Sequence, residues 1–428
     1  MTYRLAKDGD SKHSRNGNEV PCHMQFEPVR EQAHSEDPDR LRLFKVTNVI
    51  CRFNSGSGGP PRTVVAIARA GRDIWDAELF TTDYVEPKAD SLLIRDFRGH
   101  VNLLHRHAQT ALGGLLMTTG LWSSFRTQLI RGIHPDVLHL HGVWSPYLVA
   151  FARAAQANGI PYIVAPHGML EPWSLTVRAR RKSLALKTYQ GKIFRDAAAI
   201  HTTSEIEAAN LRSLGLTDAP IFVIPNAIEA PPATNGAARK SVDGRKVLLF
   251  LSRVHPKKGL DILLRAWSDL RPSDWELMIV GHGEPSYVEE LKRLCTKGKI
   301  AHVEFHSHVD GDEREAMFAR AAAFVLPTYS ENFGNVVGEA MIRGLPVITT
   351  TGTPWSVIAE RNLGWYVEPT LGGLKGALAT LFETETNLLA AMGARGRDYV
   401  KRYLLIDAVR PRLVEMYQTA LLQPARGR

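Results

Sequence analysis

One segment in the second half of the chain predicts a strand, a loop, a helix and a second strand in close succession. An apolar run at residues 324–326 ends at Pro327, a helix stops at Gly344, and a second apolar run occupies residues 345–350. This order directs the N-terminus of the helix, with its free N–H groups and partial positive charge, at the mouth of a sheet. Phosphate binds in such places, so the segment indicates an α/β sheet with an anion-binding edge.

Two glutamates flank the start of this predicted helix. Glu331 opens the loop, and Glu339 follows eight residues later inside the helix. Two glutamates at this spacing are common by chance on exposed helices, so the pair alone indicates little. At the mouth of a sheet, however, two carboxylates would suit a ligand that carries both phosphates and sugar hydroxyls.

The remainder of the chain alternates short apolar runs with helical stretches in two series, which is typical of parallel α/β sheets. Residues 1–40 are polar without a sustained period and are predicted to be a mobile tail. The first series predicts a domain at residues 41–228, and the aperiodic residues 229–244 a linker. The second series predicts a domain at residues 245–400, followed by a helix at residues 401–428. Strands are expected at residues 43–51, 76–82, 137–141, 162–165, 199–203, 221–225, 246–251, 276–280, 302–305, 324–326, 345–350 and 364–367.

The charge balance favours an anionic partner. Lys and Arg number 53 against 44 Asp and Glu, which gives a net charge of +9. Nucleic acid is not expected, because no helix-turn-helix, zinc-finger or aromatic RNA-binding pattern occurs. The three cysteines form no disulfide framework, the N-terminus has no signal-peptide pattern, and the apolar run at residues 111–122 is too short to span a bilayer. We therefore expect a cytoplasmic protein, soluble or peripheral to the inner face of the cytoplasmic membrane.

A basic loop follows the first strand of the second series. Arg253 can hold two phosphate oxygens, and Lys258, directly before Gly259, supplies a compact charge. Cations fixed beside a diphosphate leaving group stabilise the charge that it gains in the transition state. The alternative is that Lys257 and Lys258 form a solvated turn.

Together these residues resemble the Glu-x7-Glu element of retaining glycosyltransferases with the GT-B fold, in particular glycosyltransferase family 4, the group 1 glycosyltransferases. The matching positions are Pro327, Phe333-Gly334, Gly338-Glu339-Ala340, Gly344-Leu345-Pro346, Ser252-Arg253 and Lys258-Gly259. The resemblance covers about residues 41–403. It implies two Rossmann-like domains that face each other across a central cleft, with the last helix crossing back to the first domain.

The resemblance also implies a hexosyltransferase that moves a sugar from a nucleotide-sugar to a saccharide or polyprenyl-linked acceptor. The configuration would be retained, and the product would belong to a glycolipid or a polysaccharide such as lipopolysaccharide or exopolysaccharide. Glu331 would face the donor sugar, Glu339 the ribose and Val309 the nucleobase. The donor-binding set is Arg253, Lys258, Val309, Asn332, Phe333, Gly334, Asn335 and Glu339. A nucleotide-sugar epimerase and a non-catalytic scaffold of an assembly complex are the alternatives.

No metal and no other cofactor is expected beyond the nucleotide-sugar co-substrate. Asp310-Gly-Asp312 matches the Asp-x-Asp pattern that binds metal in GT-A glycosyltransferases. Asp312 precedes Glu315 by three residues at a helical start, so a capping box with Asp312 as N-cap explains the pattern more simply.

The first domain carries two candidate features. The glycine-rich residues 54–61 do not fit Gly-x-Gly-x-x-Gly but resemble the family loop near donor phosphate and acceptor, which assigns Gly58 and Gly59; a flexible turn is the alternative. His141 ends one predicted strand and His167 follows another, and at such strand ends an imidazole can contact the donor sugar. The resemblance places His167 beside the reacting carbon, so His167 and Glu331 are the catalytic candidates. A structural role for His141 stays open.

Residues 178–192 combine arginines and lysines with Leu184, Leu186 and Tyr189. This pattern predicts a basic amphipathic helix that contacts an anionic membrane. A solvated helix face is the alternative.

Overall fold

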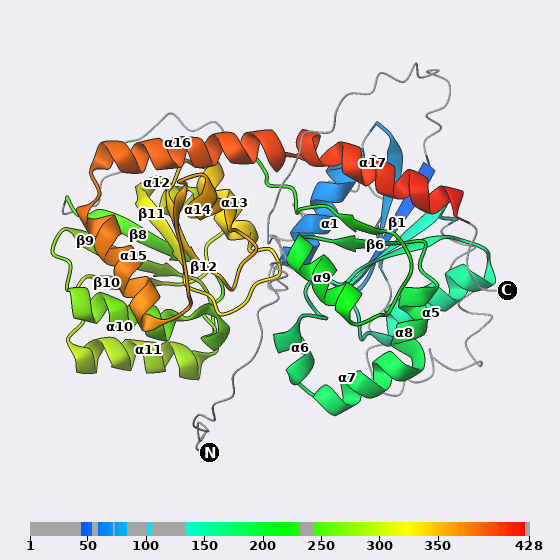
Figure 1. Cartoon of the computed structure of the whole chain (residues 1–428), viewed down its shortest axis with the longest axis horizontal. Helices are drawn as coiled ribbons and strands as arrows, with labels where there is room; N and C mark the ends of the chain where they lie inside the picture. Colours follow the sequence, from blue (N-terminus) through cyan, green and yellow to red (C-terminus); the bar gives the residue numbers. More distant parts are fainter. Residues whose placement is uncertain are drawn as a thin grey trace, which may run out of the picture.

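A computed structural model describes residues 44–53, 59–71, 73–83, 101–103, 134–231 and 244–423. Figure 1 shows two α/β domains side by side, each built on one sheet that helices cover. All strand pairs in both sheets are parallel. The expected fold class is therefore confirmed: two parallel sheets in separate domains.

The first sheet has seven strands in the order β3-β2-β1-β4-β5-β6-β7. Its register sets Ile50 beside His141 and His141 beside Ala165, so the loops after these strands open at the same edge. The strands are β1 Phe44–Arg52, β2 Trp75–Asp83, β3 Val101–Leu103, β4 Val137–His141, β5 Tyr162–Ala165, β6 Ala199–Thr202 and β7 Ile221–Val223.

Helices of the first domain begin where local residues favour them. At α5, Ser145 accepts a hydrogen bond from the amide of Tyr147 at 3.3 Å, and Pro146 occupies the first turn. The helices are α1 Gly59–Ala70, α5 Pro146–Ala157, α6 Pro172–Thr176, α7 Ala179–Ala185, the π-helical turn Leu186–Gln190, α8 Gly191–Arg195 and α9 Glu205–Ser213.

The second sheet has six strands in the order β10-β9-β8-β11-β12-β13. They are β8 Lys246–Leu251, β9 Trp275–Val280, β10 Val303–His306, β11 Ala321–Leu326, β12 Val347–Thr350 and β13 Gly364–Val367. The helices are the 3₁₀ turn Pro256–Lys258, α10 Leu260–Leu270, α11 Pro285–Gly298, α12 Gly311–Arg320, α13 Asn335–Ile342, α14 Val357–Glu360, α15 Leu371–Glu383 and α16 Thr386–Tyr403.

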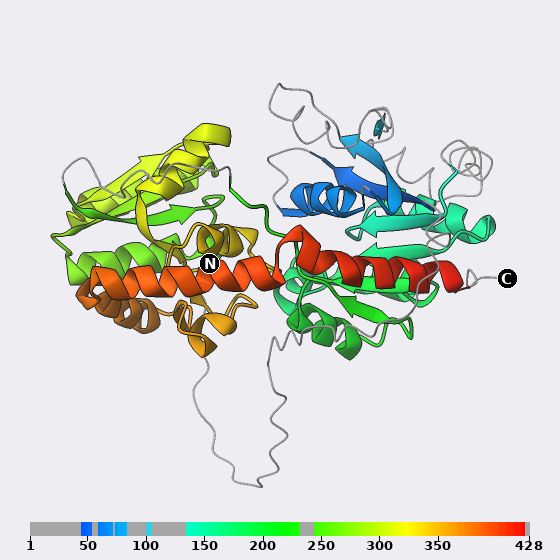
Figure 2. The same ribbon diagram turned by 90° about the horizontal axis from the view of Figure 1, so that it is seen from above.

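The last helix, α17 Ile406–Leu422, packs on the first domain although it follows the second in the chain. Figure 2 shows α16 leading into α17 along both domains. Leu413 and Tyr417 are buried among core residues of the first domain, and the Tyr417 and Trp75 rings lie 5.0 Å apart. Arg412 donates a hydrogen bond from Nη1 to the carbonyl of Val223 at 3.1 Å. This helix therefore ties the two domains together.

One helix start differs from the sequence expectation. Asp310, and not Asp312, is the N-cap of α12, and its side chain makes no capping hydrogen bond. The Asp310 carboxylate instead lies 2.7 Å from Nε2 of His308 and 3.5 Å from the guanidinium of Arg62. Asp312 falls in the first turn, where a negative charge still suits the helix dipole.

Several expectations concern residues outside the described ranges. These are the tail at residues 1–40, the apolar run at 111–122, Gly58 and most of the linker. Within the described ranges, no helix has the length and apolar character needed to cross a bilayer.

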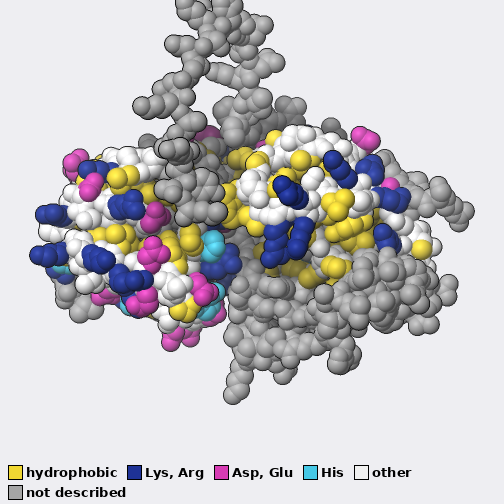
Figure 3. Space-filling view, turned by 90° about the horizontal axis from the view of Figure 1, so that it is seen from below, with side chains coloured by type: hydrophobic (Ala, Val, Ile, Leu, Met, Phe, Trp, Pro, Cys, Tyr) yellow, Lys and Arg dark blue, Asp and Glu magenta, His cyan; other side chains and the backbone are white. Residues whose placement is uncertain are grey.

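The segment predicted as a basic amphipathic helix is helical in α7, the π-helical turn and α8. Leu184 is 64% exposed, whereas Leu186 and Tyr189 pack against the domain core. Figure 3 shows this side of the molecule, and basic side chains lie next to hydrophobic ones on the first domain, at the right.

Candidate active site

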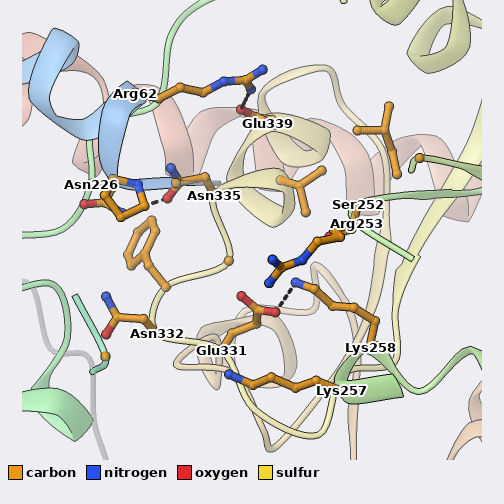
Figure 4. A pocket seen from close by; sticks show the side chains of 18 of the residues that line it. Arg62, Asn226, Ser252, Arg253, Lys257, Lys258, Glu331, Asn332, Asn335 and Glu339 are labelled. Carbon is orange, nitrogen blue, oxygen red and sulfur yellow. Dashed lines mark hydrogen bonds and ion pairs between the residues drawn. The ribbon is translucent and has the colours of Figure 1, made fainter. Parts of the chain in front are cut away.

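The carboxyl ends of both sheets border a cavity of about 380 Å³ between the domains. Figure 4 shows side chains from both domains that line it. The cavity brings together all predicted site residues that the structure describes; Gly58 lies outside the described residues. They are Gly59, His167, Arg253, Lys258, Val309, Glu331, Asn332, Phe333, Gly334, Asn335 and Glu339.

The start of α13 faces this cavity. Gly334 is the N-cap with a φ of 76°, a left-handed conformation that glycine adopts without strain, and it offers no capping side chain. The first amides of a helix have no acceptor within it, so those at Asn335 and Val336 are available to an anion. The Phe333 ring is buried against Trp355, at 5.1 Å between centroids, so its side chain supports the loop.

Lys258 and Glu331 form an ion pair inside the cavity. Their side chains are only 11% and 16% exposed, respectively. The loops that carry them are joined by Thr328, whose hydroxyl donates to the carbonyl of Lys257 at 3.0 Å. Gly259 has a φ of 67°, and a Cβ at this position would lie 2.1 Å from the carbonyl oxygen of Pro327. The two loops therefore hold the opposite charges at a fixed separation.

Two further cations lie beside this pair. The Arg253 side chain points toward Glu331 and Lys258 in Figure 4. Nζ of Lys257 lies 4.8 Å from the centre of the Trp173 ring, so Lys257 touches the first domain. Burial lowers the pKa of Lys257, against the opposing effect of Glu331 and Glu171. The solvated-turn alternative is wrong for these lysines, because both line the cavity and both are partly buried.

Glu339 is held by arginines from both domains. Nη1 of Arg62, on α1, lies 3.1 Å from its carboxylate, and Arg314 on α12 makes a second ion pair. Burial acts to raise the pKa of Glu339, but Arg314, Arg62 and Arg343 outweigh it and leave that pKa lowered. Glu339 is therefore an anion in a fixed position. Arg62 and Arg314 were not predicted from the sequence, although Arg62 directly follows the glycine-rich residues 54–61.

The first domain supplies the opposite wall. Glu171, at the start of α6, is buried and accepts a hydrogen bond from the Ser330 hydroxyl at 3.1 Å. Asn226 donates from Nδ2 to Oδ1 of Asn335 at 2.8 Å. Burial raises the pKa of Glu171. Sequence reasoning missed Glu171 and Asn226 because their contacts cross between domains; the only local signal was that Glu171 follows His167 closely.

His167 lines the cavity, and His141 lies behind it. Nδ1 of His141 and Nε2 of His167 are 3.0 Å apart. Burial, and to a lesser extent nearby His201, lowers the pKa of His167 to about 3. His167 is therefore a neutral imidazole at physiological pH. The structure favours the structural reading of His141, since this residue does not reach the cavity.

Within the described residues, no three His, Cys, Asp or Glu side chains gather in a way that could hold a metal ion. The cations and helix amides of the site can bind an anion, and its carboxylates can bind hydroxyl groups.

Two family models match the two domains separately. "Glycosyl transferase 4-like domain" covers residues 58–227, and "Glycosyl transferases group 1" covers residues 245–384. A GDP-mannose-dependent alpha-(1-6)-phosphatidylinositol monomannoside mannosyltransferase of Mycolicibacterium smegmatis is 28% identical over 294 residues, which are 64% of this chain and 74% of the relative. A phosphatidyl-myo-inositol mannosyltransferase of Mycobacterium leprae is 27% identical over 318 residues, 71% of this chain and 79% of the relative.

Solved structures share the architecture. HepE of Anabaena in complex with UDP and glucose superposes with a TM-score of 0.66 at 18% identity, over 88% of this chain and 100% of HepE. The lipopolysaccharide outer core galactosyltransferase WaaB gives a TM-score of 0.61 at 14% identity, over 88% of this chain and 99% of WaaB. At these identities the likeness concerns the fold.

Proposed function

Because the chain belongs to the group 1 glycosyltransferases of the family 4 type, with the GT-B fold, it is a hexosyltransferase that uses a nucleotide-sugar donor, and we propose that it acts with retention of configuration. The acceptor would be a saccharide or a lipid-linked molecule on the first domain. The product would belong to a glycolipid or a polysaccharide such as lipopolysaccharide or exopolysaccharide. The comparisons do not support the epimerase alternative.

The observation that carries this proposal is the division of charge in the cavity. Arg253, Lys257 and Lys258 surround one region together with the amides at the start of α13. A diphosphate there would meet charge-assisted hydrogen bonds that strengthen as the leaving group gains charge. It would also compete with Glu331 for Lys258, which frees the Glu331 carboxylate for a sugar hydroxyl.

The proposed reaction proceeds on one face of the donor sugar. The bond between the anomeric carbon and the phosphate oxygen breaks as the acceptor hydroxyl oxygen bonds to that carbon. The hydroxyl proton passes to the leaving phosphate oxygen, so no side-chain nucleophile is needed. His167 and Glu331 contact the sugar, and Glu339 contacts the ribose in exchange for Arg62. Val309 borders the base.

A two-part experiment tests the proposal. A thermal-shift panel of UDP- and GDP-sugars identifies the donor, because a ligand at 100 times its dissociation constant stabilises a protein by about 2.7 kcal/mol. The stabilising donor is then incubated with saccharide and polyprenyl-phosphate acceptors, and the anomeric configuration of the product is determined by NMR. Acceptor-dependent transfer with retention is expected. An epimerised nucleotide sugar without transfer, or an inverted product, would contradict the proposal.

We also propose that transfer needs no divalent metal. The support is that Arg253, Lys257, Lys258 and the α13 amides already line the cavity. In addition, Asp310 is engaged by His308 and Arg62. Transfer should continue after exhaustive chelation with EDTA. Activity that is lost on chelation and restored by magnesium or manganese would contradict this part of the proposal.

A peripheral membrane contact is the last part of the proposal. Arg180 and Arg181 are exposed on α7, which also carries the exposed Leu184, and Trp173 on α6 is 47% exposed. Basic residues near an anionic leaflet contribute about 1 kcal/mol each, and salt screens them. The triple variant Arg180→Gln, Arg181→Gln, Lys187→Gln should bind anionic vesicles less tightly and retain donor binding. Unchanged vesicle binding would contradict the membrane contact and would mean that α7 is a solvated helix face.

A further inference from the structure

A chain of hydrogen bonds runs beneath the cavity from a backbone carbonyl to His167. Nδ2 of Asn48 donates to the carbonyl of Glu78 at 3.4 Å. Oδ1 of Asn48 lies 3.0 Å from Nε2 of His141, and Nδ1 of His141 lies 3.0 Å from Nε2 of His167. Asn48 and His141 are buried, and His167 lines the cavity. The chain therefore connects the interior of the first domain to the proposed sugar site.

The backbone carbonyl at the start of this chain sets the direction of every hydrogen bond that follows. A backbone carbonyl only accepts, so the amide nitrogen of Asn48 faces Glu78 and Oδ1 faces His141. Oδ1 also only accepts, which places the ring proton of His141 on Nε2. A neutral imidazole has one such proton, so Nδ1 of His141 accepts and Nε2 of His167 donates. Burial lowers the pKa of both rings, which agrees with their neutral forms.

A second chain in the same cluster has the same polarity. Nε2 of His201 lies 3.1 Å from the carbonyl of Ile224, and Nδ1 of His201 lies 3.2 Å from Nε2 of His139. Nδ1 of His139 is 2.9 Å from the Tyr417 hydroxyl, which donates to it. Every histidine ring in both chains is thus the neutral Nε2–H tautomer. The second chain ends at Tyr417 and makes no hydrogen bond with His141 or His167 among the described residues.

We propose that Asn48 and His141 are positioning residues that hold His167 as the Nε2–H tautomer, with the lone pair of Nδ1 available to accept a hydrogen bond from a hydroxyl of the bound sugar. A phosphate oxygen, which only accepts, has no proton for this lone pair. His167 thus selects a hydroxylated sugar on the first-domain side, while the cations of the second domain hold the diphosphate. This inference rests on the proposed function for the identity of the ligand.

The experiment compares two substitutions of one residue with a control in the neighbouring chain. His141→Leu removes the acceptor that faces His167, and His141→Asn keeps an acceptor near the position of Nδ1. Tyr417→Phe removes a buried hydrogen bond from the second chain only. The first readout is the tautomer of His167, measured by ¹⁵N NMR of histidine-labelled protein; the His167→Gln variant identifies the signals of this ring. The second readout is kcat and KM for the donor.

The wild type should show His167 with its proton on Nε2. In His141→Leu we expect mixed tautomers and a kcat at least tenfold lower, with an unchanged dissociation constant for the nucleoside diphosphate. His141→Asn should restore most of the Nε2–H tautomer of His167 and most of kcat. Tyr417→Phe should leave both at their wild-type values, even where it lowers the melting temperature. If His141→Leu does not fold, Asn48→Leu tests the same chain.

A proton on Nδ1 of His167 in the wild type, or an unchanged tautomer in His141→Leu, would overturn the inference. So would a tautomer change that leaves kcat as in the wild type. The NMR measurement needs no turnover. Absence of transfer with every donor would therefore count against the proposed function, while the tautomer still decides the role of Asn48 and His141.

Discussion

At the scale of single residues, the cavity holds its charged groups in pairs that a ligand must exchange. Lys258 is paired with Glu331, and Glu339 with Arg62 and Arg314. A buried charge that loses its partner is costly, so each pair keeps the site ordered. A ligand with phosphates and hydroxyls can replace one member of each pair. In the proposed function a diphosphate competes with Glu331 for Lys258, whereas the ribose replaces Arg62 at Glu339. The two glutamates should therefore differ in function.

We predict that Glu331→Ala chiefly lowers kcat, by roughly 10²–10³-fold, because in the proposed function this carboxylate faces the reacting sugar, and its ion pair holds Lys258. Glu339→Ala should chiefly raise the dissociation constant of the nucleotide, by about 10–100-fold, the range for a lost hydrogen bond to a charged group. Steady-state kinetics and calorimetry measure the two effects. Glu313→Ala, exposed on α12 outside the cavity, is the matched control. Wild-type transfer in both cavity variants would refute the site assignment.

Glu207 gives a prediction on pH. It accepts hydrogen bonds from the amides of Gly168 and Thr203, and burial raises its pKa to about 7. The native state therefore holds a proton at pH values where the unfolded chain, with its pKa near 4.5, has lost it. Wild-type stability should fall as pH rises through about 7, whereas Glu207→Gln cannot titrate there. The difference in unfolding free energy between the two proteins, measured in urea from pH 5 to 8, should shift in favour of the variant. A constant difference would contradict the raised pKa.

At the scale of elements, the site depends on two loops that approach each other closely. A non-glycine residue in a left-handed backbone conformation costs roughly 1–3 kcal/mol. Gly259→Ala should destabilise the protein by more than this, because the new Cβ also meets the carbonyl of Pro327. Gly372→Ala, in the first turn of α15 with open space around it, should be neutral or stabilising by up to about 1 kcal/mol. Urea unfolding of both variants tests the contrast. Equal effects would mean that the loops can separate.

Strand positions followed from the sequence because buried parallel strands are continuous apolar runs between polar turns. The expectations at residues 137–141, 162–165, 246–251 and 364–367 match their strands residue for residue. The three-residue strand β3 was not predicted, because Val101–Leu103 is too short to show a pattern. The N-cap of α12 was assigned to Asp312 instead of Asp310, and the contact of Asp310 with Arg62 of the first domain left no local signal.

Part of the site was predictable from the second domain alone, although Arg314 of that domain was missed. Arg253, Lys258, Glu331 and Glu339 follow strands of a single parallel sheet, so their carboxyl-end loops had to meet. Their chemical roles stay predictions. Arg62 and Glu171 contribute through contacts across the cleft, and the placement of one domain against the other leaves no periodic signal in a sequence.

At the scale of the whole molecule, α17 makes the stability of the first domain depend on a helix that the chain reaches only after the second. Leu413 is 1% exposed among Val46, Trp75 and Ile163, whereas Leu422 on the same helix is 84% exposed. Leu413→Ala should therefore cost about 2–5 kcal/mol, and Leu422→Ala close to nothing.

The location of that loss is the sharper test. Hydrogen exchange in Leu413→Ala should accelerate in β1 and β4, against which α17 packs, and stay as in the wild type in β8 and β9 of the second sheet. Acceleration confined to α17 would mean that the first domain is stable without its last helix. Equal acceleration in both sheets would mean that the two domains unfold as one cooperative unit, since α17 would then transmit the loss through α16 to the second core.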